Sequence, residues 1–401
     1  MALKKGPASI IGGGMSGLSA AYKPEQFGIP YELRESSNYW GGKLRTTHLD
    51  GFSLDHGFQV IQSAYPGLTE YRQKGLLDGA LAFGSGAWLL TATGKTLIAD
   101  PLKHGMKGIG ALFHPEIAMS DVWNIITLRK KLLNTRPPDF FAPQFSSPPN
   151  TIPSTYEYLR SYGFTEPFIE SFFRPFFTGI FLEEALQTPY ALFQFVFWAL
   201  AKGDALLMPN GIQTLPLRIA ETLNPKNIFL NETVGENHQH HIPYRKTTTL
   251  YYSLNHDAGL GKFLALNATR MGKVNSISVP SMVQPTYAPK GKHLLSVSLK
   301  PSFSGTQPIE SLSGEIKTEV ENLLHTPLNA EFIQAFDVTT ALPMNTPYLY
   351  SLTEPLDTES APPHPFMAGQ NIANPSLNAA ILSGFQFAEQ FRRYQAQESA
   401  L

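Results

Sequence analysis

The chain has 401 residues, a net charge of −1 and no cysteine. This length is too great for one hydrophobic core, so we expect two closely joined domains. A nearly neutral charge provides no basic field for nucleic acid. The absence of cysteine excludes disulfides, thiolate nucleophiles and cysteine-based metal sites, and it fits a cytoplasmic protein.

The first apolar run is short and interrupted by glycines, which is typical of a buried strand and not of a signal peptide. No stretch approaches the roughly 20 apolar residues that a membrane span needs. The chain nevertheless carries 27 Phe and 16 Tyr. Such aromatic content indicates a large apolar cavity or an apolar surface patch, and we predict a peripheral rather than an integral link to a membrane.

Near the N-terminus a short strand precedes a glycine-rich turn and the start of a helix. Gly12, Gly14 and Gly17 occupy the three positions of the dinucleotide-binding fingerprint. Gly12 permits a tight turn, Gly14 leaves room for a pyrophosphate, and Gly17 lets the helix pack closely on the strand. Met15 and Ser16 begin the helix, whose backbone N–H groups and positive dipole end attract phosphate.

A second strand candidate ends at Glu35, where a carboxylate can accept hydrogen bonds from an adenosine ribose. A second glycine turn follows, with Gly41, Gly42, Lys43 and Arg45. Its backbone N–H groups and two cations can approach the other side of a pyrophosphate.

These motifs together resemble the FAD-binding segment of the flavin amine oxidase and phytoene desaturase superfamily. Nicotinamide dehydrogenases normally lack the second glycine turn, so the resemblance favours FAD over NAD. It implies an α/β fold in which a Rossmann-like FAD-binding domain is interleaved with a mixed α+β substrate domain. The expected ranges are 1–75, 205–246 and 340–401 for the FAD-binding domain, and 76–204 and 247–339 for the substrate domain with its helical cap.

The stretch from Asp55 to Val60, followed by Ala64-Tyr65-Pro66, matches a desaturase-like subgroup of this superfamily. The resemblance places Gly57 and Phe58 beside the flavin. His56 is a candidate catalytic residue that touches the isoalloxazine or relays a proton. The alternative is that His56 is only a turn residue between Asp and Gly.

The aromatic run from Phe172 to Phe181 resembles the helical cap of the carotenoid desaturase branch. Such a run either forms core or lines a pocket for a long apolar substrate. Arg174 lies inside it and needs a partner. That partner is a neighbouring carboxylate, Glu170 or Glu183, or the acidic head of a substrate, in which case Arg174 is a second candidate catalytic residue.

The resemblance also assigns residues in the second half of the chain. A strand is expected over 228–234, and its Val234 would meet the adenine. The connector 235–246 is shorter than in family members, as though one β-meander were missing. Its histidines at 238–241 suggest a metal site, but the spacing provides no complete ligand set, so we expect a solvated loop and no metal.

The C-terminal signature of the family corresponds here to Gly369, Gln370, Ser376, Leu377 and Ala379. The resemblance places the first N–H groups of the following helix at flavin N1 and O2, where they stabilise negative charge. Gln370 replaces the usual Asp. Its amide can still bond ribityl or phosphate oxygens, although it lacks a carboxylate's acceptor character.

Local patterns predict several further elements. Pro24 should end or kink the first helix near Tyr22, and Thr93-Gly94 should form the turn of a hairpin. Helical spacing dominates 101–133, and the Pro- and Ser-rich stretch 136–153 predicts a loop or lid. Strands are expected over 247–254, 262–266, 276–280 and 293–299, and an amphipathic helix over 310–324.

The sequence therefore predicts a protein that binds FAD without covalent attachment. Its expected reaction is hydride transfer to flavin N5 from an apolar, isoprenoid-like or carotenoid-like lipid substrate, with the flavin carrying the chemistry. The alternatives are a flavin amine oxidase, an FAD-dependent double-bond isomerase and a non-catalytic FAD-binding protein. The sequence leaves the oligomeric state and the electron acceptor open.

Overall fold

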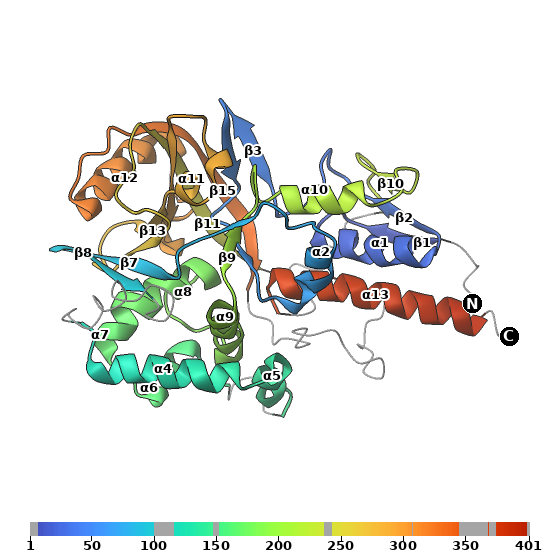
Figure 1. Ribbon diagram of the computed structural model, residues 1–401, viewed down its shortest axis with the longest axis horizontal. Coiled ribbons are helices and arrows are strands. Elements are labelled where there is room, and N and C mark those ends of the chain that lie inside the picture. The colour runs from blue at the N-terminus through green and yellow to red at the C-terminus, as the bar shows by residue number, and fades with distance from the viewer. Residues whose placement is uncertain are drawn as a thin grey trace.

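The computed structural model contains two regions that lie side by side in Figure 1. One is built on a parallel three-stranded sheet, the other on a mixed seven-stranded sheet with a helical cap. This is the predicted α/β architecture with a second, mixed region. The structure describes residues 7–99, 116–146, 152–235, 243–306, 308–344, 368 and 374–398.

The parallel sheet has the order β1 (Ala8–Ile11), β2 (Tyr31–Arg34) and β10 (Ile228–Phe229). Parallel neighbours need a crossover connection, and helix α1 (Met15–Phe27) provides it between β1 and β2. The third strand joins only after the chain has passed through much of the other region. The first region is therefore discontinuous in sequence.

The prediction that α1 ends near Tyr22 is wrong. The helix continues through Pro24 to Phe27, and Gly28 ends it in the left-handed conformation with a φ of 66°. Pro24 lies near the C-terminus and is buried, so its missing N–H interrupts the helix at one position only. Packing of the buried face offsets that loss, because tertiary contacts provide most of a helix's stability in a folded protein.

Helix α13 (Leu377–Glu398) packs along α1, and Figure 1 shows the two side by side. The contact is close at Gly384, where an added Cβ would lie 2.3 Å from the carbonyl oxygen of Ser16. The C-terminal helix thus lies against the helix that follows the glycine turn. Helix α10 (Thr214–Glu221) also contacts α1.

The seven-stranded sheet supports the second region. Helix α12 (Ile309–Leu324) covers one of its faces and buries Leu312, Ile316 and Val320 in a common core with the strands. The predicted hairpin at Thr93-Gly94 and the predicted helix 310–324 are confirmed. The strand order is β15 (Glu331–Pro343), β11 (Tyr244–Leu254), β14 (His293–Leu299), β13 (Val274–Ser278), β12 (Leu264–Asn267), β7 (Gly86–Thr91) and β8 (Gly94–Ala99).

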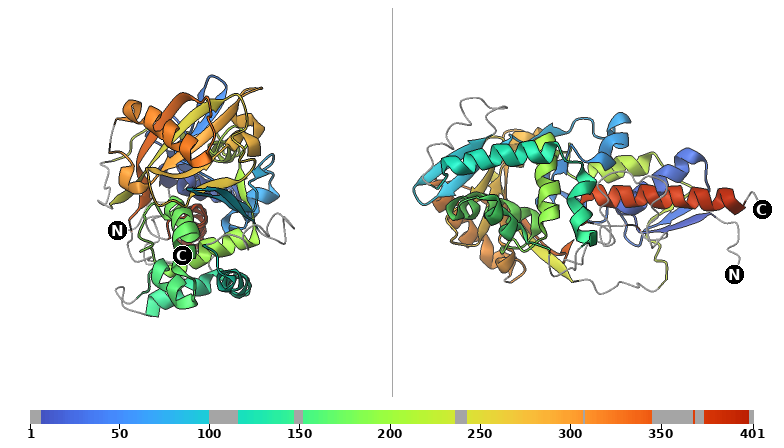
Figure 2. Two further views of the ribbon diagram at one scale, coloured as in Figure 1. Left: turned by 90° about the vertical axis from the view of Figure 1, so that its left-hand side faces the viewer. Right: turned by 90° about the horizontal axis from the view of Figure 1, so that it is seen from below.

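The helical cap lies on the side of this sheet opposite α12, as the two views of Figure 2 show. Phe173, Phe177, Phe181 and Phe193 are almost completely buried inside it, and their rings pack edge to face or tilted. Most of the aromatic run is therefore core. The cap consists of α4 (Met119–Leu133), α6 (Thr155–Tyr162), α7 (Glu166–Phe168), the π-helical turn η4 (Ile169–Phe173), α8 (Arg174–Phe181) and α9 (Tyr190–Lys202).

The predicted loop over 136–153 is wrong in its first part, which forms helix α5 (Pro137–Ser146). Two of its prolines stand at the first two helical positions. Proline is tolerated there because the N–H groups of a first turn have no partner within the helix. Composition alone therefore misidentified a helix start as a loop.

Short elements connect the two regions. Strands β11 and β15 run through positions 246 and 340, so the predicted domain limits fall inside strands and stay a prediction. The remaining short elements of the described residues are β3 (Thr46–Leu49), β4 (Phe52–Asp55), β5 (Ile61–Gln62), η1 (Pro66–Leu68), α2 (Thr69–Gln73), β6 (Leu81–Ala82), β9 (Ala205–Leu207), α11 (Pro280–Val283), η5 (Pro285–Tyr287) and η6 (Pro301–Phe303).

Candidate active site

Two glycine turns meet at the end of β1. The N–H of Gly41 donates to the carbonyl of Gly13 at 2.9 Å, and Gly14 and Gly41 form a parallel bridge. An added Cβ on Gly42 would lie 3.1 Å from the Cα of Gly14. The second turn therefore packs its backbone directly against the first, and a side chain at position 42 would push the two apart.

The first turn leaves the N-terminus of α1 without a side-chain cap. Its N-cap residue is Gly14, in an extended conformation. Met15, Ser16 and Gly17 follow in the first turn and line a large cavity. An added Cβ on Gly17 would lie 1.8 Å from the carbonyl oxygen of Gly12, so helix and strand approach closely. The uncapped helix start is a favourable place for an anion.

Glu35 closes the first turn from the side. Its carboxylate accepts hydrogen bonds from the backbone N–H of Gly13 at 2.5 Å and of Ser37 at 2.7 Å. Partial burial acts to raise the pKa of Glu35, but these hydrogen bonds outweigh it and the net shift is downward. The side chain is thus an ionised acceptor next to the glycine turns.

The predicted strand 228–234 is wrong beyond Phe229. The chain then leaves the ladder but stays close, and the N–H of Glu232 donates to the carbonyl of Glu35 at 2.9 Å. Val234 lies two residues further on in irregular structure and is 37% exposed. Its contact with adenine stays a prediction.

The two cations of the second turn, Lys43 and Arg45, lie in different surroundings. Lys43 lines the cavity, donates to the carbonyl of Ala341 at 3.3 Å and lies 4.3 Å from the centre of the Tyr244 ring. Burial lowers the pKa of Lys43 to about 8. Arg45 instead stacks over Tyr39 at 4.4 Å. Lys43 is therefore the cation that faces the cavity.

Asp55 is a buried carboxylate that connects both regions. Its oxygens accept hydrogen bonds from the hydroxyl of Thr46 at 2.7 Å, the N–H of Ile212 at 2.9 Å and the hydroxyl of Tyr287 at 2.6 Å. Tyr251 donates to its backbone carbonyl at 2.7 Å. Burial raises the pKa of Asp55 to about 6 although the hydrogen bonds lower it. This carboxylate fixes the start of the segment that carries His56 and Gly57.

His56 lines the cavity next to this carboxylate. Its Nε2 is 2.9 Å from the hydroxyl of Thr47, and its ring stacks on Phe336 with centroids 4.0 Å apart. Burial and the nearby charge of Arg45 lower the pKa of His56 to about 4. The imidazole is therefore neutral at physiological pH.

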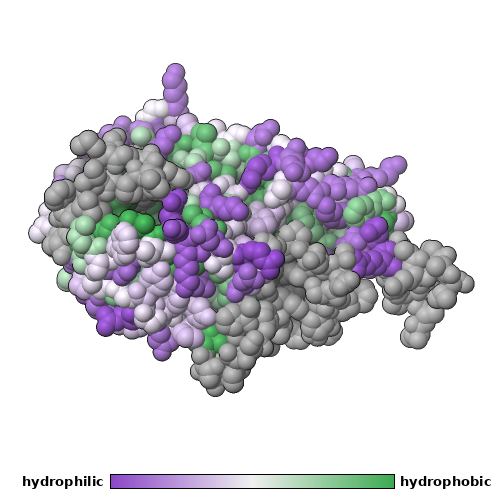
Figure 3. All heavy atoms as spheres, turned by 60° about the horizontal axis from the view of Figure 1, so that its bottom comes forward, coloured by the Kyte–Doolittle hydropathy of each residue, from purple (hydrophilic) through white to green (hydrophobic). Residues whose placement is uncertain are grey.

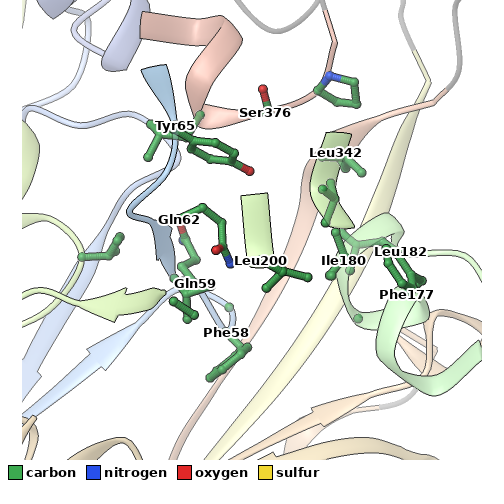
Figure 4. Close-up of a pocket in the computed structure, with 18 of the residues that line it drawn as sticks. Phe58, Gln59, Gln62, Tyr65, Phe177, Ile180, Leu182, Leu200, Leu342 and Ser376 are labelled. Carbon is green, nitrogen blue, oxygen red and sulfur yellow. The ribbon is translucent and has the colours of Figure 1, made fainter. Parts of the chain in front are cut away.

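A cavity of about 1410 Å³ extends from the glycine turns to the helical cap. Figure 4 shows Phe58 and Tyr65 on one side of it and Ile180 and Leu342 on the other. At one end the walls are backbone and polar groups, including Gly12, Gly14, Gly42, Gly57 and Ser376. At the other end they are apolar, including Phe172, Phe176, Phe177, Phe197, Leu200 and Leu266.

Four polar residues of the cavity wall were not among the predicted site residues. Gln59 donates from Nε2 to the carbonyls of Lys43 and His56. Gln62 is 7% exposed, and its Oε1 has no hydrogen-bond partner among the described residues. Gln59 lies within the motif from Asp55 to Val60, and Gln62 follows it by two residues. The motif was therefore a signal that could have identified both side chains. The wall also contains Tyr65, whose ring stacks on Phe195, and Asp204.

Arg174 has the internal partner that was predicted as one alternative. Its Nε donates to Glu170 at 2.7 Å, and its guanidinium also donates to the carbonyl of Glu184. It lies 5.7 Å from the centre of the Tyr156 ring. Its neighbour Pro175 lines the cavity, whereas Arg174 is not among the described lining residues. These contacts give Arg174 a structural part in the cap, and its catalytic role stays a prediction.

The N-terminus of α13 faces the cavity through Ser376 and Leu377. The hydroxyl of Ser376 accepts a hydrogen bond from the N–H of Ala379 at 3.0 Å. That N–H is therefore used within the helix start, and Ala379 itself is buried. Gly369, Gln370 and the histidines at 238–241 lie outside the described residues, so their predicted roles stay predictions.

The sequence of the chain matches the family described as flavin-containing amine oxidoreductase over residues 15–250, more than half of its length. The chain belongs to this family. It is an FAD-dependent oxidoreductase, as the two glycine turns and Glu35 predicted.

Individual relatives are more distant. A 4,4'-diaponeurosporene oxygenase of Staphylococcus aureus is 38% identical over 71 residues, which cover 17% of this chain and 14% of that protein. A solved structure from Exiguobacterium sp. 255-15, provisionally assigned as a protoporphyrinogen oxidase, has a TM-score of 0.66 at 16% identity and covers 98% of this chain and 100% of its own. A putrescine oxidase bound to putrescine has a TM-score of 0.62 at 14% identity, with coverages of 96% and 99%. These two likenesses show the shared fold.

The described residues fit an FAD. The uncapped start of α1 and the bare backbone of Gly14 offer N–H groups and space for a pyrophosphate, and Glu35 provides an acceptor for a ribose. The cavity continues from there past Gly57 to Leu377, which leaves room for a tricyclic ring. Among the described residues, no group of three or more side chains is arranged to hold a metal ion.

Proposed function

We propose that the protein binds FAD without covalent attachment and oxidises an apolar, lipid-like substrate by transferring a hydride from a C–H bond to flavin N5. A bound flavin would supply the redox chemistry, because its two-electron reduction would take up both hydrogens that the substrate loses, one as a hydride and one as a proton. The protein supplies binding, orientation and exclusion of water.

The observation that carries this proposal is the gradient along the cavity wall. The glycine turns, Lys43 and Ser376 form one end, and the Phe, Ile and Leu side chains of α8 and α9 form the other. A continuous apolar wall next to the predicted flavin position suits a long apolar chain whose reacting bond is set against the ring. The 38% identical segment of the diaponeurosporene oxygenase adds support for a carotenoid-like substrate.

The polar side chains near the predicted flavin position have distinct parts. Lys43 places a positive charge on the cavity wall, where it balances a negative charge on the cofactor. Gln59 is held by two backbone carbonyls, so its amide is fixed in position. His56 is neutral and the pKa of its imidazole is lowered to about 4, so this side chain is a weak base. Positioning therefore contributes more than a side-chain base in this proposal.

Amine oxidation is the second candidate, and Asp204 is the observation that favours it. Among the described residues that line the cavity, Asp204 is the carboxylate that could pair with an ammonium group. It precedes β9, and its backbone N–H donates to the hydroxyl oxygen of Ser63 at 2.8 Å. The putrescine oxidase with the same fold shows that this architecture can accommodate an amine in that protein.

Anaerobic reduction of the bound flavin distinguishes these functions. The purified yellow protein is mixed with a carotenoid-like polyene in detergent micelles, or with primary amines and polyamines in buffer, and flavin absorbance is followed. We expect bleaching with the apolar substrate only, and a product lighter by two hydrogens. Bleaching by amines alone, abolished in Asp204→Asn, would overturn the proposal in favour of amine oxidation.

Leu200→Gln tests whether the apolar wall binds the substrate. Figure 4 shows Leu200 projecting into the cavity, and an amide there costs about 1 to 3 kcal/mol of apolar binding. We expect a rise in KM of roughly tenfold or more. The matched control is Leu217→Gln on α10, where the side chain is 41% exposed and not among the described lining residues. An isomerase would release a product of unchanged mass, and a carrier would show no bleaching.

A further inference from the structure

Helix α4 carries an apolar stripe on the outside of the cap. Met119, Trp123, Ile126 and Leu133 are 69%, 66%, 53% and 37% exposed. Their spacing of four, three and seven residues places them on one face of a helix. Four large apolar side chains in a row form a patch whose exposure to water is unfavourable in free energy. The face of the molecule that includes the cap is turned forward in Figure 3, where hydrophobic atoms lie between hydrophilic ones.

Positive charge accompanies this stripe. Arg129, Lys130 and Lys131 follow one another in the last turns of α4, and both lysines are exposed. Lys202 ends α9, the helix packed against α4. The one carboxylate of α4, that of Asp121, is buried and accepts hydrogen bonds from Thr165. The outer face of α4 therefore presents apolar and cationic groups together.

The same helix forms part of the cavity wall. Ile125, Ile126 and Leu133 line the cavity together with Arg129 and Lys130. Ile126 and Leu133 thus belong both to the exposed stripe and to the cavity, so the apolar surface continues from the outside of the molecule to its interior. An apolar molecule can follow this surface without crossing bulk water.

We propose that the outer face of α4 docks on an anionic lipid bilayer, so that the cavity opens toward the membrane and takes its substrate from there. This proposal rests on the proposed apolar substrate. An interfacial helix buries its apolar side chains among the acyl chains while its lysines reach the headgroups. Each cation near an anionic leaflet adds about 1 kcal/mol of attraction. Among the described residues, no helix has the length and apolar character of a membrane span.

Flotation of the flavin-loaded protein with vesicles tests the surface. We expect co-flotation with phosphatidylcholine vesicles that contain phosphatidylglycerol, and weaker binding without the anionic lipid or at high salt. The double variant Met119→Ser/Trp123→Ser should lower the partition constant by roughly tenfold or more. The matched control is Met271→Ser, since Met271 is 76% exposed on the turn between β12 and β13. It should float like the wild type.

Trp123 also provides a native spectroscopic reporter. Trp40 and Trp198 are buried at 8% and 3% exposure and Trp88 is partly buried, whereas Trp123 is 66% exposed. Vesicle binding should therefore shift tryptophan emission to shorter wavelength, and Trp123→Phe should remove the shift while the protein still floats. Unchanged emission on binding would show that another face contacts the lipid.

Two results would overturn the docking surface. One is a double variant that floats like the wild type. The other is a wild type that does not float but is a dimer which the double variant converts to a monomer, because a second copy then covers α4. Neither Met119 nor Trp123 lines the cavity, so bleaching by substrate in micelles should be unchanged in the double variant. Loss of bleaching in the wild type, with flotation intact, would instead refute the proposed function and leave the surface standing.

Discussion

Gly14 and Gly42 lie back to back where the two glycine turns meet. A Cβ built on Gly42 would lie 3.1 Å from the Cα of Gly14, whereas one built on Gly14 would have no atom of the chain nearer than 3.9 Å. The space beside Gly14 is therefore left open by the protein itself. Such space beside an uncapped helix start is what a pyrophosphate requires.

Gly14→Ala should fold normally and purify without its yellow colour. The φ of Gly14 is −75°, which any residue adopts, so the added methyl group displaces the cofactor and not the protein. The measurement is the ratio of flavin to protein absorbance, together with the thermal midpoint of the flavin-free forms. Full flavin occupancy in Gly14→Val, which carries a larger side chain, would contradict this assignment.

Two other glycines provide the controls for that variant. Gly314 lies in α12 with open space around it, so Gly314→Ala should keep the flavin and gain up to about 1 kcal/mol of stability. Gly17→Ala should fail to fold, since its Cβ would lie 1.8 Å from the carbonyl oxygen of Gly12. Alanine should therefore displace the flavin at position 14, leave it bound at position 314 and prevent folding at position 17.

Sequence reasoning recognised the features that depend on local chemistry. The glycine turns, the carboxylate at Glu35 and the hairpin at Thr93-Gly94 follow from backbone conformations that only certain residues permit. It failed where long-range packing decides, as in α1, which continues through Pro24 because of its burial. It also could not show that Asp55 accepts a hydrogen bond from Tyr287, which lies more than two hundred residues away in the sequence.

The same distinction applies to the candidate site. The motif around Gly57 pointed to the correct wall of the cavity, but the neutral state of His56 depends on Arg45 and on burial. The exposed stripe on α4 has ordinary helical periodicity in the sequence. Its exposure was not predictable, because apolar spacing alone does not tell which face of a cap helix lies against the core.

Arg174→Ala should destabilise the cap and leave flavin reduction nearly unchanged. The variant removes the ion pair with Glu170, whose carboxylate is only 14% exposed, and the bond to the carbonyl of Glu184. We expect a loss of about 1 to 3 kcal/mol in the free energy of unfolding, measured by urea denaturation. A reduction rate lowered by roughly a hundredfold or more at full flavin occupancy would restore the catalytic hypothesis for Arg174.

Asp55 should make the protein less stable as pH rises. Its pKa is about 6 in the folded protein against 3.8 in the unfolded chain, so the folded state holds the proton more tightly. The resulting stabilisation is complete below pH 4 and is lost as pH rises through about 6, with a contribution of at most about 3 kcal/mol. Asp55→Asn keeps an oxygen for Thr46 and Ile212 and should lack this decline. The measurement is the unfolding free energy of both proteins between pH 4 and 8.

Removing a hydrogen-bond donor to Asp55 should leave the pH dependence of the unfolding free energy unchanged. Tyr287→Phe deletes one hydrogen bond to Asp55 at 2.6 Å but keeps the buried carboxylate. This variant should retain the decline with pH and be less stable at every pH by about 1 to 2 kcal/mol. Identical pH profiles for Asp55→Asn and the wild type would show that the carboxyl group does not titrate in this range.

His56 should act in the opposite direction to Asp55 and contribute little as a base. Its pKa is about 4 in the folded protein and 6.5 in the unfolded chain, so its contribution to stability is present above pH 6.5 and is lost as pH falls through about 4. His56→Gln should remove that loss. Glutamine can still bond Thr47, although it cannot reproduce the ring stacking on Phe336.

Because the imidazole stays neutral, we expect the anaerobic rate of flavin reduction in His56→Gln to remain within roughly tenfold of the wild type, with the same pH profile. General acid or base catalysis typically contributes about 10² to 10⁴ in rate. A loss of that size, together with a changed pH profile, would show that His56 relays a proton and that base catalysis contributes more than positioning.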